Sequence, residues 1–148
     1  CRFGIFGEYS EEVTAKIVTI VESFVSVQVS WRVSVIKTHP SSGSLRNLSR
    51  APLKRNPIEE LTDLFDIAVC GCVSSVSTEL AGQGVPVLLY VPLGSLNFCV
   101  DRRLPSFHDL FSFNQALVCL LRDRNSEVYP SLYIRSQGIE KWRSLCSD

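Results

Sequence analysis

Short segments that are apolar at most positions constrain the fold of this chain more than any other feature. Four of them lie at residues 2–6, 31–36, 66–70 and 86–91. A strand with one face in water alternates apolar and polar residues, whereas a strand covered on both faces is apolar throughout. We therefore expect these segments to form a parallel sheet that is buried on both faces.

Segments with helical periodicity separate the expected strands. Ser10 is a suitable N-cap for the first helix, and the acidic residues Glu11 and Glu12 suit its positive end. Apolar residues then recur at helical spacing at Val13, Ile17, Ile20, Val21 and Phe24. A second helix with an apolar face is predicted over residues 107–122. The alternation predicts an α/β fold: a three-layer, Rossmann-like parallel sheet with helices on both faces.

The remaining elements are predicted from their turn residues. Pro57 is well placed to open a helix. The residues of that helix expected to face inward are Ile58, Leu61, Leu64 and Phe65. Residues 71–75 form a turn before a helix that ends near residue 82 or 84. A short strand is expected near residues 48–53, and a closing helix within residues 129–145.

Length and composition indicate one domain. The chain has 148 residues, 45% of them hydrophobic and 20% charged, with a net charge of zero. This balance is typical of soluble globular domains and argues against a nucleic-acid groove or a polybasic membrane patch. No apolar run approaches the roughly 20 residues that span a bilayer. Because the chain begins at Cys1 and lacks methionine, we expect residues 1–148 to be a single domain of a longer, two-domain protein.

The six cysteines raise the question of a disulfide framework. Such frameworks belong mainly to short, loop-rich secreted chains, whereas Cys70, Cys72, Cys99 and Cys119 lie in apolar segments. We expect these thiols to be reduced and buried, as in a cytoplasmic protein. A zinc site is not indicated, because no second cysteine pair or histidine cluster follows at metal-ligand spacing.

The first candidate site is the turn after the first strand. Parallel sheets bind ligands beyond the carboxyl ends of their strands, so residues directly after strands are the candidates. Gly7 allows a close approach of ligand to backbone, and Ser10 stands at a helix start, where anions bind. The alternative is an ordinary strand-to-helix turn with a serine cap.

The second candidate site follows the second strand. Lys37 supplies a point charge, and His39 can donate a hydrogen bond or add a charge when protonated. Both could therefore bind a phosphate. Pro40 stops the strand and restricts His39 to an extended backbone. The alternative is a polar strand end that faces water.

The third candidate site is the helix start after residue 73. Ser74, Ser75 and Ser77 offer hydroxyls there, beside the free N–H groups of a first helical turn. Glu79 is placed to hold a ribose hydroxyl or a base. The alternative is simple capping, although a capping box is out of register because Glu79 follows Val76 by three.

Together these motifs resemble the C-terminal half of GT-B glycosyltransferases, closest to the sialyltransferase-like enzymes that build bacterial surface carbohydrates. The carrying segments are residues 31–40, WRVSVIKTHP, and residues 66–87, DIAVCGCVSSVSTELAGQGVPV. The resemblance covers about residues 1–122. It implies a nucleotide-sugar (donor) binding domain in which His39 meets the phosphate, with Lys37 nearby and Ser74 and Ser75 donating hydrogen bonds.

The resemblance also implies partners. The donor would be a CMP- or UDP/CDP-linked sugar, and no cofactor or metal is expected. A glycan or lipid-linked acceptor and the general base would belong to an N-terminal domain outside this chain. No catalytic residue is identified here, so the isolated chain should bind without turnover. The whole protein would be cytoplasmic, with peripheral association at the inner face of the membrane as an option, and without a nucleic-acid partner.

Two other functions fit the same architecture. One is a half-domain of a nucleotide-sugar epimerase, whose base would also lie mainly outside this chain. The other is a non-catalytic interaction domain in which the phosphate-binding motifs have lost their role. Thr38 stands where the family commonly has proline, which is a departure from the pattern.

Overall fold

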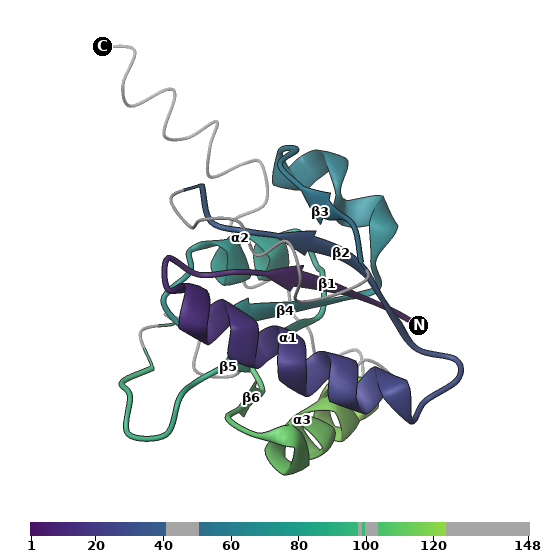
Figure 1. The fold of residues 1–148 in the computed structure, drawn as a ribbon, viewed down its shortest axis with the longest axis vertical. Helices are drawn as coiled ribbons and strands as arrows, with labels where there is room; N and C mark the ends of the chain where they lie inside the picture. The colour runs from purple at the N-terminus through teal and green to yellow at the C-terminus, as the bar shows by residue number, and fades with distance from the viewer. Residues whose placement is uncertain (41–50, 98, 100–103, 124–148) are drawn as a thin grey trace.

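A six-stranded parallel sheet organises the chain (Figure 1). The computed structural model describes residues 1–40, 51–97, 99 and 104–123. The strands are β1 (Arg2–Phe6), β2 (Arg32–Lys37), β3 (Leu53–Lys54), β4 (Ile67–Gly71), β5 (Val87–Tyr90) and β6 (Ser106–Phe107). They lie in the order β3-β2-β1-β4-β5-β6, and every neighbouring pair is parallel. The expected Rossmann-like α/β arrangement is confirmed.

Helices cover both faces of the sheet. The helices are α1 (Glu11–Ser26), α2 (Val76–Gly82) and α3 (Leu110–Asp123), with two 3₁₀ turns, η1 (Ile58–Glu60) and η2 (Thr62–Leu64). In Figure 1, α1 and α3 lie on one side of the sheet and α2 on the other. Two separate apolar clusters match this division: one contains residues of α1 and α3, and the other contains residues of η1 and α2.

Aromatic rings fill the layer between the sheet and the α1–α3 face. Phe3 of β1 is fully buried, and its ring stacks on Trp31 at a centroid distance of 5.0 Å. Phe24 of α1 and Phe113 of α3 contact each other edge to face at 5.3 Å, and both also contact Phe3. Aromatic pairs at these separations stabilise a core beyond the area they bury. This cluster attaches both helices to β1.

The opposite layer depends on a strand residue without a side chain. Gly4 of β1 faces Phe65, and a Cβ atom at Gly4 would lie 2.6 Å from that ring. Phe65 also packs edge to face against Phe6, at a centroid distance of 5.2 Å. The absence of a side chain at Gly4 therefore lets the Phe65 ring lie directly on the sheet.

Some sequence predictions were wrong in detail. The predicted helix over 107–122 starts too early, because Phe107 belongs to β6 and pairs with Tyr90. Asp109 then accepts a hydrogen bond from the Ser112 amide at the start of α3. The helix expected after Pro57 is replaced by the two short 3₁₀ turns, and Leu64 is exposed. Residues 48–50 of the strand expected near 48–53, and the closing helix expected within 129–145, lie outside the described residues.

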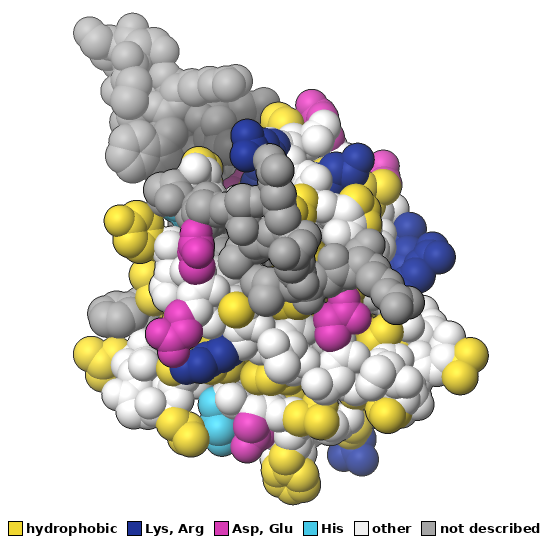
Figure 2. All heavy atoms as spheres, in the orientation of Figure 1, with side chains coloured by type: hydrophobic (Ala, Val, Ile, Leu, Met, Phe, Trp, Pro, Cys, Tyr) yellow, Lys and Arg dark blue, Asp and Glu magenta, His cyan; other side chains and the backbone are white. Residues whose placement is uncertain are grey.

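The cysteine prediction holds for three of the four residues. Cys70, Cys72 and Cys99 are buried free thiols, and burial raises the pKa of the Cys70 thiol. Cys119 is a free thiol too, but it is exposed. The buried face of α3 is formed by Phe113, Ala116, Leu117 and Leu120, which places Cys119 on the outer side. On the face shown in Figure 2, acidic and basic side chains are interspersed among apolar ones.

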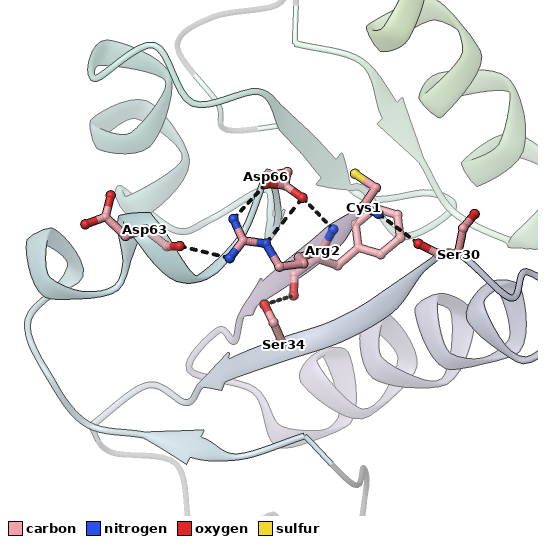
Figure 3. Close-up of polar contacts among 7 residues, drawn as sticks. Cys1, Arg2, Ser30, Ser34, Asp63 and Asp66 are labelled. Atoms are coloured by element: carbon pink, nitrogen blue, oxygen red, sulfur yellow. Dashed lines mark hydrogen bonds and ion pairs between the residues drawn. The ribbon is translucent and has the colours of Figure 1, made fainter.

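An ion pair joins the amino ends of the two central strands (Figure 3). Asp66 precedes β4 and accepts hydrogen bonds from the Arg2 backbone amide at 2.8 Å and from Arg2 Nη2 at 2.9 Å. Arg2 Nη1 also donates to the Asp63 carbonyl at 3.0 Å. The hydrogen bond from Arg2 is the main reason that the pKa of Asp66 lies below its usual range. This contact fixes β1 against β4 at the edge opposite the strand ends that bind ligands in such folds.

Replacing Asp66 with alanine should destabilise the fold at neutral pH by about 1 kcal/mol, since the pair is partly exposed and screened. A carboxyl whose folded pKa is lowered stabilises the fold above its unfolded pKa and loses that contribution as pH falls. The free energy of unfolding, measured by urea denaturation, should therefore differ most between wild type and Asp66→Ala at pH 7, and the difference should shrink below about pH 4. Asp63→Ala, which keeps the carbonyl, is the control; an equal loss there would contradict the role of Asp66.

Candidate functional site

The strand order reverses direction between β1 and β4, which makes their carboxyl ends the topological switch point of the sheet. The turn after β1 contains residues 7–10, and the turn after β4 contains residues 72–75. Glu8 in the first turn accepts a hydrogen bond from the Val73 amide in the second, at 2.8 Å. We call the meeting of these two turns the switch-point junction.

Several polar groups of the first turn form hydrogen bonds within the protein. Gly7 donates its amide to the Lys37 carbonyl at 2.8 Å, and a Cβ there would lie 2.7 Å from Thr14. The Ser10 hydroxyl accepts from the Val13 amide at 3.3 Å and caps α1. Thr14 donates to the Ser10 carbonyl at 3.0 Å. Gly7 and Ser10 therefore occupy the roles of an ordinary capped turn, which was the alternative considered from the sequence.

The side chains of Lys37 and His39 contact different parts of the chain. The Lys37 ammonium donates to the backbone carbonyls of Asn56 and Arg55, so it fastens the segment that follows β3. His39 is exposed, and its ring meets Tyr9 edge to face at a centroid distance of 5.8 Å. The structure thus brings His39, and not the Lys37 charge, beside the turn after β1.

The serines of the third turn differ in accessibility. The Ser74 hydroxyl accepts from the Val76 amide at 3.3 Å. Ser77 is 0% exposed, donates to the Ser74 carbonyl at 2.8 Å and lies 3.9 Å from the Cys99 sulfur. Ser75 is exposed and stands at the N-cap of α2 without a side-chain capping bond. Ser75 is thus the serine with the most accessible hydroxyl, while Ser77 supports the turn from inside; Glu79 is exposed on α2.

Sequence reasoning overlooked Glu8. Its side chain is 8% exposed, and its carboxyl group lies where a Cβ on Gly71 would otherwise be. The ion pairs among the described residues involve Asp66, Glu12 and Asp109 instead. The sequence does contain a signal: an ionisable residue two positions after the apolar segment that ends at Phe6.

The charges at this edge are unevenly distributed. Glu8, Glu11 and Glu12 all lie at the start of α1, and Glu12 pairs with Lys16 at 2.8 Å, which lowers the pKa of Glu12. His39 lies on the β2 side. An anion is therefore disfavoured at the start of α1 and better accommodated toward the ends of β2 and β4. Among the described residues, no group of three or more His, Cys, Asp or Glu is arranged to hold a metal ion.

An open hollow of about 370 Å³ lies at the other edge of the sheet, between residues 29–32 and the Arg2–Asp66 pair. None of the predicted site residues lines it.

The helices of the described part of the chain include none that is long and apolar enough to cross a membrane.

Alanine at Gly71 and alanine at Gly4 should have different effects, although both glycines lie in central strands. At Gly71 the new Cβ would occupy the place of Oε1, Cδ and Cγ of Glu8, so the whole Glu8 side chain must move out to solvent, and the cost should be about 1 kcal/mol, the value of the lost hydrogen bond to Val73. At Gly4 it meets the buried Phe65 ring, and overpacking should cost about 1–3 kcal/mol.

Urea denaturation of the two glycine variants measures this difference, and the Val73 amide resonance reports loss of the Glu8 contact. A larger loss of stability for Gly71→Ala than for Gly4→Ala would contradict the expectation that the displaced Glu8 side chain reaches solvent.

Comparisons with known proteins identify no relative. No protein-family model matches the chain. No curated protein and no solved structure matches it either.

Proposed function

We propose that this chain binds a nucleotide sugar at the carboxyl edge of its sheet, as the donor-binding domain of a glycosyltransferase. The observation that carries the proposal is the switch point between β1 and β4, where Glu8 links the two turns. Open α/β sheets bind their ligands at this location. The residues with accessible polar groups around it suit a ligand that combines a phosphate, a sugar and a base.

The phosphate is placed toward His39 and Ser75. Both side chains are exposed, both can donate hydrogen bonds, and they follow strands on either side of β1. Two strand spacings put the ends of β2 and β4 about 10 Å apart, so His39 and Ser75 would reach the phosphate from opposite sides. Lys37 and Ser77 are left out of the direct contacts, because their polar groups bind backbone carbonyls.

Tyr9 provides a surface for a planar group. It is 76% exposed although it follows the central strand, and it contacts His39. An exposed aromatic ring at a ligand-binding edge can stack on a nucleobase, and such stacking tolerates different bases. The placement of Tyr9 next to His39 supports a nucleotide as the ligand more than an isolated sugar phosphate.

In this proposal the chain contributes by holding the departing nucleotide. As the bond to the sugar breaks, negative charge develops on the phosphate, and hydrogen-bond donors already in place lower the barrier. His39 and Ser75 are the proposed donors. The general base and the acceptor are assigned to a second domain. Product analysis of the full-length protein separates transfer to an acceptor from epimerisation of the free nucleotide sugar.

Replacing His39 and Ser75 together with alanine should weaken nucleotide binding. The loss of one charge-assisted contact corresponds to about 1.5–3 kcal/mol, or roughly 10- to 150-fold in affinity. Calorimetric titration of the purified chain with CMP, CDP and UDP measures the change.

The matched control for this double variant is His108→Ala with Ser106→Ala. These residues offer the same pair of groups near the carboxyl end of β6, four positions from β2 in the sheet. The control should bind like wild type. If the folded wild-type chain binds none of the three nucleotides at millimolar concentration, the proposal is wrong; if only the control pair weakens binding, the site is misplaced.

A further inference from the structure

We infer that Glu8 selects a ribose-containing ligand, with Oε2 of its carboxyl group accepting a hydrogen bond from a ribose hydroxyl. This inference rests on the proposed nucleotide binding and assigns a specificity-determining residue to it. Glu8 is the buried acidic residue of the switch-point junction, and its Oε1 is already engaged with the Val73 amide. Within the described part of the chain, no residue donates a hydrogen bond to Oε2.

The energetics of Glu8 argue against a purely structural role. A buried carboxyl group is costly unless cations or several hydrogen-bond donors compensate it. Here the described residues supply one hydrogen bond, to Oε1, and no ion pair. Because no buried side-chain oxygen among them lacks a partner, Oε2 is in contact with solvent and accessible to a ligand. A glutamine could make the same bond with Val73 through its amide oxygen, without the charge. The fold therefore does not require a carboxyl group at this position, whereas a ligand hydroxyl would make use of the second oxygen.

The surroundings hold this carboxyl group at the switch point. Gly71 ends β4 opposite Glu8, and the space that a Cβ would fill there contains the Glu8 side chain. The Thr14 hydroxyl accepts from the Glu8 amide at 3.0 Å, which fixes the backbone from the other side. The Glu8 backbone is thus held by α1 and its carboxyl group by the turn after β4, at the carboxyl ends of the two central strands.

The chemistry of the carboxyl group determines which part of a nucleotide it can meet. It accepts hydrogen bonds from hydroxyls and repels phosphate, and Glu11 and Glu12 add to that repulsion at the start of α1. The adjacent Tyr9 is the proposed surface for the base. Because the ribose connects base and phosphate, a base on Tyr9 and a phosphate between His39 and Ser75 leave the ribose near Glu8, whose carboxyl group lies on the β4 side of Tyr9.

The test compares Glu8→Gln with wild type using CMP and UMP and their 2′,3′-dideoxy counterparts. Glu8→Gln keeps the bond to Val73 and removes the charge. This substitution should weaken the binding of the ribonucleotides about tenfold, because a hydrogen bond to a charged group is lost. The dideoxy nucleotides should bind it as well as or better than they bind wild type. Thermal unfolding should show Glu8→Gln to be at least as stable as wild type.

Two further variants make the result specific. Glu11→Gln removes an exposed negative charge from the same helix start and should leave the preference for ribonucleotides unchanged. Gly71→Ala displaces the Glu8 side chain without changing it, and should reduce the ribonucleotide affinity selectively. If Glu8→Gln fails to fold, Gly71→Ala carries the same test.

Three outcomes overturn the inference alone. Equal weakening of ribose and dideoxy nucleotides by Glu8→Gln would point to phosphate or cation binding, or to damage of the fold. Tighter binding of both would mean that Glu8 only repels anions. Unchanged binding of both would mean that Glu8 does not meet the ligand. Absence of nucleotide binding by the folded wild type would overturn the proposed function together with this inference.

Discussion

The burial of β1 on both faces is the constraint on which the other elements depend. Its residues alternate between the two layers: Phe3 and Ile5 enter the aromatic cluster under α1 and α3, while Gly4 and Phe6 face Phe65 on the other side. Because β1 also pairs with β2 and β4, its two edges and two faces are all occupied. The helices are placed by this strand, and the strand in turn ends at the switch point.

The proposed site follows from what happens where that strand ends. The chain must leave the sheet there and start α1, and it does so with a glycine, a buried acid, an exposed aromatic residue and a capping serine. Internal hydrogen bonds involve Gly7, Ser10 and the Glu8 amide, whereas the Glu8 carboxyl group meets the Val73 amide and the exposed Tyr9 ring meets His39. A ligand that combines a hydroxylated ring with an aromatic base matches these two groups.

The sequence was a good guide to whatever depends on local pattern. β1, β2, β4 and β5 were predicted to within one residue at their ends, and the start of the first helix was predicted at its Ser10 cap, because apolar runs and periodicity mark them. β6 was missed because two residues carry no pattern, and its pairing with β5 depends on the Pro105 and Phe107 carbonyls. The site was harder. Lys37 binds the carbonyl of Asn56, and Glu8 meets Gly71, so the orientation of each side chain is decided by a residue far along the chain.

The Arg2–Asp66 pair and the switch-point junction join the same two strands at opposite ends. One contact provides adhesion at the edge where no ligand is expected, and the other lies where recognition is proposed. Such a scaffold can tolerate amino-acid substitutions in the turns of the switch-point junction, because β1 and β4 remain joined at their amino ends. Redesign of residues 7–10 and 72–75 for another ligand would therefore leave the alignment of β1 and β4 to the arginine and the aspartate.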